Sequence, residues 1–280
     1  MKNFEFSQPT TLKELLDLLA REKDYQLLAG GTDLLVKWKR GQSSPKNVVN
    51  LKQIQELNFL SLDEKGLEIG ALVKIADLIK NSVIQEKYPA LIQSAKAHSS
   101  PLIRNLATVV GNVCNASPAA DLVPALLVYD AKVKIRMGNE ERYVELKDFF
   151  VGPGQTILKQ GELVISIFIP MPSAQMKSYF LKEGKRKAHE IAVANCAVSY
   201  LNDDSKISDL KVALGAVAPK PLLITELDWF TEINNANLNR LSQLVKETVS
   251  PITDQRSTDW YRREVIQVLV KRAITLAQSV

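Results

Sequence analysis

The segment from Ala107 to Leu126 combines small residues, side chains that form local hydrogen bonds and one carboxylate between two apolar runs. Gly111 permits a close approach or a positive φ, and the alanines keep space open. The polar residues that can bond either the chain or a ligand are Thr108, Asn112, Asn115 and Ser117. This mixture suits a backbone that wraps closely around a ligand. It suits equally a polar loop that leads into a buried helix, so the segment alone does not decide between the two.

Ser117 and Pro118 have the residue types of an N-cap and a first helical residue, so a helix is expected to start there. A capping box would place an acidic residue at position 120, but that residue is Ala120 and the carboxylate follows at Asp121. We therefore expect Asp121 to be free for a partner other than the start of the helix.

A second segment, residues 27–39, is typical of a short apolar strand, a Gly-Gly turn and an amphipathic helix. Such a turn presents several backbone N–H groups in one direction and suits a phosphate or pyrophosphate. We assign this anion to the amides of Gly30, Gly31 and Thr32. The Asp33 carboxylate would repel it, so we expect that side chain to cap the helix. A tight turn with an ordinary N-cap explains the motif in isolation about as well.

Other nucleotide-binding motifs and nucleophilic centres are not evident. No Gly-x-Gly-x-x-Gly follows a strand, and no Walker loop occurs. No Ser/His/Asp or Cys/His arrangement indicates a nucleophile, so no catalytic residue is assigned. Cys114 and Cys196 are too few for an iron–sulfur cluster or a zinc site. No metal site is expected, and Cys114 is expected to be a small buried hydrophobe.

Bulk composition describes an ordinary globular chain. The 280 residues are 46% hydrophobic, enough for a core that serves two or three subdomains. The net charge of +5 is spread among both signs, and aromatic residues are sparse. These features suit a phosphate-rich ligand but give no support for nucleic-acid binding. Because no run has the length of a signal sequence or a membrane span, we expect a cytoplasmic protein without membrane contact.

Three units are expected along the chain. Residues 1–55 predict a small α/β layer with strands at 4–7, 25–29 and 48–50 and a helix capped by Thr11. Residues 56–172 predict a strand at 67–70, helices at 75–80 and 90–97, a helix after Asp121 that Pro124 interrupts, and a hairpin with strands at 132–137 and 142–145. Closely spaced prolines then mark a boundary, and residues 173–280 predict strands at 178–182, 192–201 and 211–216 with helices at 238–249 and 260–277.

Seven pieces, in order along the chain, resemble the FAD-binding medium subunit of the molybdenum hydroxylases, the family of xanthine dehydrogenase, aldehyde oxidase and aerobic carbon monoxide dehydrogenase. These pieces are residues 29–33, 108–112, 115–121, 161–170, 185–192, 214–219 and 259–264. The resemblance covers essentially the whole chain. It implies an α+β protein with a two-subdomain FAD-binding fold of the vanillyl-alcohol-oxidase (PCMH) type, formed by residues 1–55 and 56–172, and a C-terminal α+β domain, residues 173–280.

The resemblance also implies the residues that hold FAD without a covalent bond. The first loop would bind the pyrophosphate through Leu27, Leu28, Ala29, Gly30, Gly31, Thr32, Asp33 and Leu34. The second would bind the rest of the dinucleotide and the ribityl chain through Thr108, Val109, Val110, Gly111, Asn112, Asn115 and Asp121. Val164, through its backbone, and Lys182, through its ammonium, would lie near the isoalloxazine, where a cation stabilises the anionic reduced flavin. The alternative for Lys182 is an ordinary solvated lysine.

Two histidines depart from the family pattern. His98 stands where the animal enzymes carry an aromatic residue near the cofactor, and an imidazole can stack there over a smaller area. His189 falls in a segment that resembles a mobile family loop beside the flavin, where the animal enzymes have a carboxylate. A neutral or cationic group there would change the field on the flavin. For each histidine, a surface or packing role is the alternative.

The function implied by the resemblance is electron transfer within a hetero-oligomeric oxidoreductase of the xanthine dehydrogenase type. FAD would take electrons from iron–sulfur centres on a partner chain and pass them to NAD⁺ or another acceptor, while hydroxylation takes place at a molybdenum cofactor on a third chain. Two alternatives are a free-standing flavin reductase of the same fold and a non-catalytic nucleotide-binding scaffold subunit.

Overall fold

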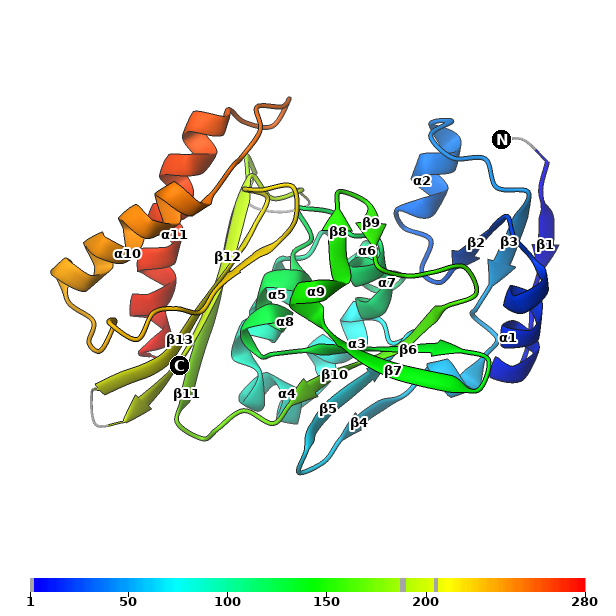
Figure 1. The fold of residues 1–280 in the computed structure, drawn as a ribbon, viewed down its shortest axis with the longest axis horizontal. Coiled ribbons are helices and arrows are strands. Elements are labelled where there is room, and N and C mark those ends of the chain that lie inside the picture. The colour runs from blue at the N-terminus through cyan, green and yellow to red at the C-terminus, as the bar shows by residue number, and fades with distance from the viewer. Residues whose placement is uncertain (1–2, 187–189, 204–205, 280) are drawn as a thin grey trace.

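The computed structural model describes residues 3–186, 190–203 and 206–279 and arranges them in three units along the long axis of the molecule (Figure 1). The first unit is a parallel sheet of order β1-β3-β2 with two helices. Its elements are β1 (Glu5–Ser7), α1 (Leu12–Arg21), β2 (Tyr25–Leu28), α2 (Leu34–Lys39) and β3 (Asn47–Asn50). Thr11 caps α1 by accepting a hydrogen bond from the Glu14 amide, which confirms the expected helix start.

The second unit is built on an antiparallel sheet of order β4-β5-β10-β6-β7. Its strands are β4 (Leu60–Leu62), β5 (Gly66–Gly70), β6 (Lys132–Met137), β7 (Glu140–Glu145) and β10 (Leu163–Pro170), with a separate pair, β8 (Phe150–Gly152) and β9 (Gln155–Thr156). Its helices are η1 (Gln55–Leu57), α3 (Ile75–Lys80), α4 (Ser82–Lys87), α5 (Pro89–Ala97), α6 (Pro101–Arg104), α7 (Val109–Cys114), α8 (Leu122–Val128) and α9 (Leu146–Phe149). The expected strand, the two early helices and the hairpin are confirmed.

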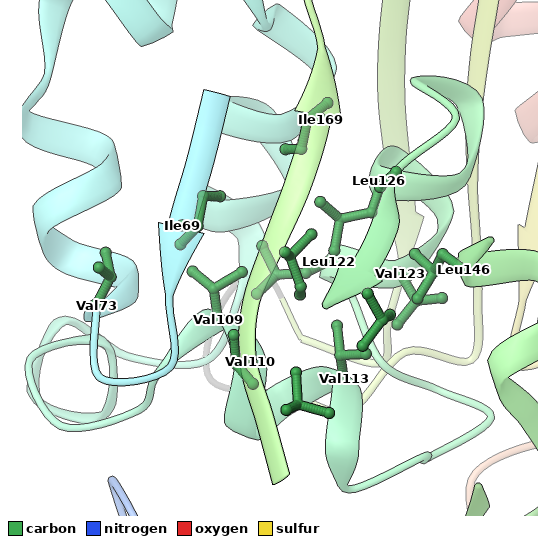
Figure 2. Close-up of a cluster of buried hydrophobic side chains, with 14 of the residues drawn as sticks. Ile69, Val73, Val109, Val110, Val113, Leu122, Val123, Leu126, Leu146 and Ile169 are labelled. Carbon is green, nitrogen blue, oxygen red and sulfur yellow. The ribbon is translucent and has the colours of Figure 1, made fainter. Parts of the chain in front are cut away.

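Apolar side chains of α7 and α8 fix the 107–126 segment to the core. Figure 2 shows Val109, Val113 and Leu122 gathered beside Ile69 of β5 and Ile169 of β10. All five side chains are fully buried. Burial of a side chain of this size contributes about 1.5–3 kcal/mol. The polar residues between these anchors are therefore held on a rigid support.

The third unit is an antiparallel sheet of order β11-β12-β13-β14 that lies between two layers of helices (Figure 1). Its elements are β11 (Met176–Glu183), β12 (Ala194–Asp203), β13 (Lys206–Gly215), β14 (Leu222–Ile224), α10 (Asn235–Thr248) and α11 (Asp259–Ala277). Helix α11 packs on one face of the sheet, and α10 packs against α11. Helices α5 and α8 contact β11 and β12 from the other side. This contact brings side chains of the third unit to the second.

Two expectations about the 117–128 segment are wrong. Ser117 does not start a helix: the Ala120 amide donates to the Ser117 carbonyl in a turn, and α8 begins only at Leu122. Pro124 does not interrupt α8, because it is the third residue of the helix. The first amides of a helix make no hydrogen bond within it, so the N–H that proline lacks is not needed there. Conversely, residues 109–114, where the sequence predicts no helix, form α7.

Among the described residues, no helix is both long enough and apolar enough to cross a membrane. The strand β10 ends at Pro170 and β11 begins at Met176, so the expected boundary after residue 172 falls in the connection between them. The three-domain division at residues 55 and 172 stays a prediction.

Candidate cofactor-binding cleft

A cleft of about 680 Å³ brings the two polar segments of the sequence together. Its wall includes Leu27, Ala29, Gly30, Gly31, Thr32, Asp33 and Leu34 from the first segment and Thr108, Val110, Gly111, Asn112, Asn115 and Asp121 from the second. His98 and Val164 line it as well. Three residues expected at the site, Leu28, Val109 and Lys182, are not part of the wall.

The two glycines of the first loop have different structural tasks. A Cβ atom at Gly30 would lie 2.3 Å from the Leu106 carbonyl oxygen, so only glycine lets the two segments approach this closely. Gly31 has a φ of +73°, in the left-handed region that favours glycine. Within the described chain, the amides of Gly30, Gly31 and Thr32 donate to no protein group. Three consecutive amides at the cleft wall are thus available to an anion.

The expected capping role of Asp33 is wrong. Asp33 has helical dihedral angles, φ −101° and ψ −45°, and makes no side-chain capping bond. N-cap residues instead have extended dihedrals that turn the side chain back toward the helix. The Asp33 carboxylate lies 2.7 Å from the ammonium of Lys37, one helical turn later. The negative charge near the free amides is therefore paired with a lysine of α2.

Thr108 and Gly111 shape the second segment. The Thr108 hydroxyl accepts a hydrogen bond of 3.0 Å from the Gly111 amide and caps α7. A Cβ atom at Gly111 would lie 2.7 Å from that hydroxyl, so glycine protects the cap. Asn112 follows on α7 and lines the cleft. Its Oδ1 atom is buried and has no hydrogen-bond partner in the described protein. An unsatisfied buried acceptor at a cleft wall fits a ligand that donates a hydrogen bond, such as a ribityl hydroxyl.

Asp121 is the centre of a buried polar cluster. We expected Asp121 to be free of the helix start, and its carboxylate indeed makes no capping bond to α8. The residue is only 4% exposed. It lies 2.8 Å from the Lys182 ammonium, 3.3 Å from Nδ1 of His98 and 3.3 Å from Nδ2 of Asn195. Lys182 and Asn195 belong to β11 and β12, so the third unit supplies two of the three contacts.

Lys182 is not a solvated lysine, since its side chain is only 11% exposed. Besides Asp121, its ammonium donates to the Ala97 carbonyl at 3.1 Å and to the Glu190 carbonyl at 2.7 Å. These three acceptors match the three donors of an ammonium. Lys182 therefore orients Asp121 from behind the cleft wall and fixes the chain at Glu190, which does line the cleft.

Of the two histidines singled out in the sequence, the structure describes His98. His98 lines the cleft, and its side chain, 16% exposed, faces Asp121 through Nδ1. Arg104 Nη1 donates to the His98 carbonyl at 3.0 Å and fixes the backbone at this position. His189 lies outside the described residues.

Cys196 is buried, but Cys114 is only half-buried and lines the cleft, so the expectation that Cys114 is a small buried hydrophobe is wrong. No group of three or more potential metal ligands occurs among the described residues. Burial raises the pKa of the Cys114 and Cys196 thiols to about 12 in each case. A thiol with such a pKa is almost wholly protonated at neutral pH and is a poor nucleophile and metal ligand.

Three charged residues of the cleft wall were missed by the sequence reasoning: Lys37, Glu162 and Glu190. Lys37 has a local signal, because it lies four residues after Asp33 on one helix. Glu162 pairs with Arg142 through two hydrogen bonds of 3.1 and 3.0 Å. This contact joins residues 20 positions apart and has no local signal in the sequence.

Two models of known protein families match the chain, one over its first part and one over its last part. Residues 2–172 match the FAD binding domain in molybdopterin dehydrogenase. Residues 179–277 match the CO dehydrogenase flavoprotein C-terminal domain. The first match contains the whole wall of the cleft except Glu190 and Ile191.

Relatives and solved structures agree with this assignment over nearly the full length. The chain is 31% identical over 277 residues to the xanthine dehydrogenase FAD-binding subunit of Escherichia coli O157:H7, covering 97% of this chain and 95% of the relative. It is 29% identical over 273 residues to the glyceraldehyde dehydrogenase medium chain of Sulfolobus acidocaldarius, covering 96% of each. A carbon monoxide dehydrogenase chain from Hydrogenophaga pseudoflava superposes with a TM-score of 0.94 at 26% identity, covering 99% of this chain and 98% of that chain. This protein therefore belongs to the family of FAD-binding medium subunits of the molybdenum hydroxylases.

Proposed function

We propose that this chain binds one FAD non-covalently in the cleft and relays electrons within a multi-subunit molybdenum hydroxylase. Bound FAD supplies the ability to exchange electrons one or two at a time. The electrons would come from iron–sulfur centres on a partner subunit and go to NAD⁺ or another acceptor. Hydroxylation would take place at a molybdenum cofactor on a third subunit.

The observation that carries the proposal is the chemistry of the cleft wall. The free amides of Gly30, Gly31 and Thr32 would hold the pyrophosphate. The buried and unpaired Oδ1 of Asn112 would accept a hydrogen bond from the ligand. A tight turn with an ordinary cap explains neither feature, since three amides and one side-chain carbonyl oxygen have no partner among the described residues of the protein.

The remaining residues position the ligand and exclude water from it. Val164 lines the cleft beside Leu163, on the strand β10, and would present its backbone to the flavin. Asp121, held by Lys182 and His98, would accept hydrogen bonds from the ligand with its orientation already fixed. Lys182 would act on the flavin through Asp121 and the Glu190 segment, because its ammonium is directed there.

The partner subunits are inferred from the relatives. One related structure is described as a carbon monoxide dehydrogenase that lacks the Mo-pyranopterin moiety of its molybdenum cofactor, and another as a Cu,Mo-CO dehydrogenase. The curated relatives are named as subunits or chains of dehydrogenases. By analogy, the substrate of this complex would be bound by another chain.

The proposal is tested by purifying the protein with its genomic neighbours and recording its visible spectrum and metal content. A flavin spectrum together with molybdenum and iron in one complex, and flavin reduction when substrate is added, would support it. A colourless chain that FAD does not reconstitute would contradict both this proposal and a free-standing reductase. A flavoprotein that is fully active without partners would favour the reductase.

A further inference from the structure

Four carboxylates line the cleft, and each lies near a basic side chain. Asp33 lies 2.7 Å from Lys37, and Asp121 lies 2.8 Å from Lys182. Glu162 is 3.0 Å from Arg142, and Glu190 is 3.9 Å from Arg186. Of the four bases, only Lys37 is itself part of the cleft wall, and it is the one lysine or arginine there among the described residues. A ligand with a pyrophosphate therefore meets four carboxylates in this wall and, among the described residues, one lysine, Lys37.

Lys37 lies where the two binding segments meet. Its ammonium is 2.7 Å from Oδ2 of Asp33 on the first segment and 2.7 Å from Oδ1 of Asn115 on the second, 78 residues later. An ammonium has three donors, and within the described chain these two acceptors are its only partners. The side chain is 40% exposed, so a ligand in the cleft can reach the third donor.

We propose that Lys37 is a specificity-determining residue that makes the cleft selective for a flavin carrying a pyrophosphate. The ammonium compensates the Asp33 carboxylate, which would otherwise repel the anion beside the Gly30–Thr32 amides. Its third N–H donates to a pyrophosphate oxygen. This inference rests on the proposed FAD-binding function and adds the residue that recognises the charged part of the ligand.

A structural role is the competing explanation, since Lys37 also ties the two segments together through Asn115. The two roles differ in the ligands that they affect. Loss of a tie would weaken every flavin, because the cleft as a whole would loosen. Loss of anion recognition would weaken FAD and ADP but not riboflavin, which carries no phosphate.

The test measures dissociation constants of FAD, ADP and riboflavin for the cofactor-free full chain, by flavin fluorescence and calorimetry. In Lys37→Gln, FAD and ADP should bind roughly 10- to 100-fold more weakly, the effect of one lost charge-assisted hydrogen bond. Riboflavin should stay within about twofold of the wild type, on the same reasoning. Lys37→Arg should retain most of the FAD affinity. The double variant Asp33→Asn/Lys37→Gln should recover part of it, because the repelling carboxylate is gone.

Lys39→Gln is the matched control, because Lys39 ends the same helix, is exposed and lies outside the cleft wall. It makes the same change in net charge and should leave all three affinities unchanged. Unchanged FAD affinity in Lys37→Gln would overturn the inference, and so would equal weakening of FAD and riboflavin. In both cases wild-type FAD binding would leave the proposed function standing. Failure of the wild type to bind any flavin would instead contradict the proposed function.

Discussion

The Lys182 ammonium lies 2.8 Å from the Asp121 carboxylate and joins the third unit to the wall of the cleft. Both side chains are nearly inaccessible, at 11% and 6% exposure, and they are 61 residues apart. The third unit therefore contributes to the candidate site both from behind the wall, through Lys182, and in the wall itself, through Glu190 and Ile191.

We predict that Lys182→Met lowers the free energy of unfolding by about 3–5 kcal/mol, because it leaves a buried carboxylate without its countercharge. FAD affinity should fall as well, since Asp121 loses its fixed orientation. Chemical denaturation and flavin titration measure the two effects. Lys132→Met is the control: its ion pair with Glu145 is exposed, at 39% and 42%, and should contribute about 0–1 kcal/mol. Equal losses in the two variants would contradict the assigned role of Lys182.

Gly30→Ala should destabilise the fold by about 1–3 kcal/mol and weaken FAD binding, because the new methyl group would push the first segment away from the Leu106 carbonyl. Gly152→Ala is a suitable control, since a Cβ atom there would meet only Gln155 Oε1 at 3.7 Å. Thermal unfolding and FAD titration of both variants provide the comparison. A Gly30→Ala protein with wild-type stability and affinity would show that the close approach is dispensable.

Asn112→Leu should separate cofactor binding from stability. The Oδ1 atom has no protein partner, so an apolar side chain of similar volume should leave the stability of the cofactor-free protein within about 1 kcal/mol or raise it. FAD affinity should nevertheless fall by about 10-fold, through one lost hydrogen bond. Asn105→Leu, at an exposed position outside the cleft wall, should change neither quantity. Undiminished FAD affinity in Asn112→Leu would remove this residue from the site.

Alkaline pH should destabilise the protein through its two thiols, Cys114 and Cys196. Burial raises the pKa of Cys114 and of Cys196 from 9.0 to about 12. Between these values the unfolded chain loses thiol protons that the folded chain retains. The unfolded state then binds fewer protons, and stability falls as pH rises from about 9 to about 12. Denaturation across this range, in the wild type and in Cys114→Ala/Cys196→Ala, measures the effect. An equally steep decline in the double variant would assign it to other groups, such as the buried phenol of Tyr129.

Helix caps and turns that depend on a few neighbouring residues could in part be predicted from the sequence. Thr11 was identified as the cap of α1, and the glycine turn and the free amides of residues 30–32 follow from the Gly-Gly pair. Helix α7 was missed because its six residues, Val109–Cys114, are too few to show a helical period and include Gly111. Asp33 and Ser117 were misassigned as caps because both residue types also favour turns, and the carboxylate of Asp33 forms an ion pair instead.

Contacts between distant parts of the chain could not be predicted from local pattern. The link from Lys37 to Asn115 spans 78 residues and the link from Asn195 to Asp121 spans 74. Each depends on how distant helices and strands pack against one another, which no short motif specifies. The family resemblance named Lys182 as a cofactor residue, but only the structure shows that its ammonium donates to Asp121 and to the Glu190 carbonyl.

The most direct test of the account is a titration of the cofactor-free full chain with FAD, with ADP as a competitor. The account predicts saturation at one FAD per chain, displacement by ADP from the pyrophosphate site, and loss of tight binding in Gly30→Ala and Asn112→Leu. No saturable binding, or binding that both variants leave unchanged, would contradict the assignment of the cleft as the flavin site.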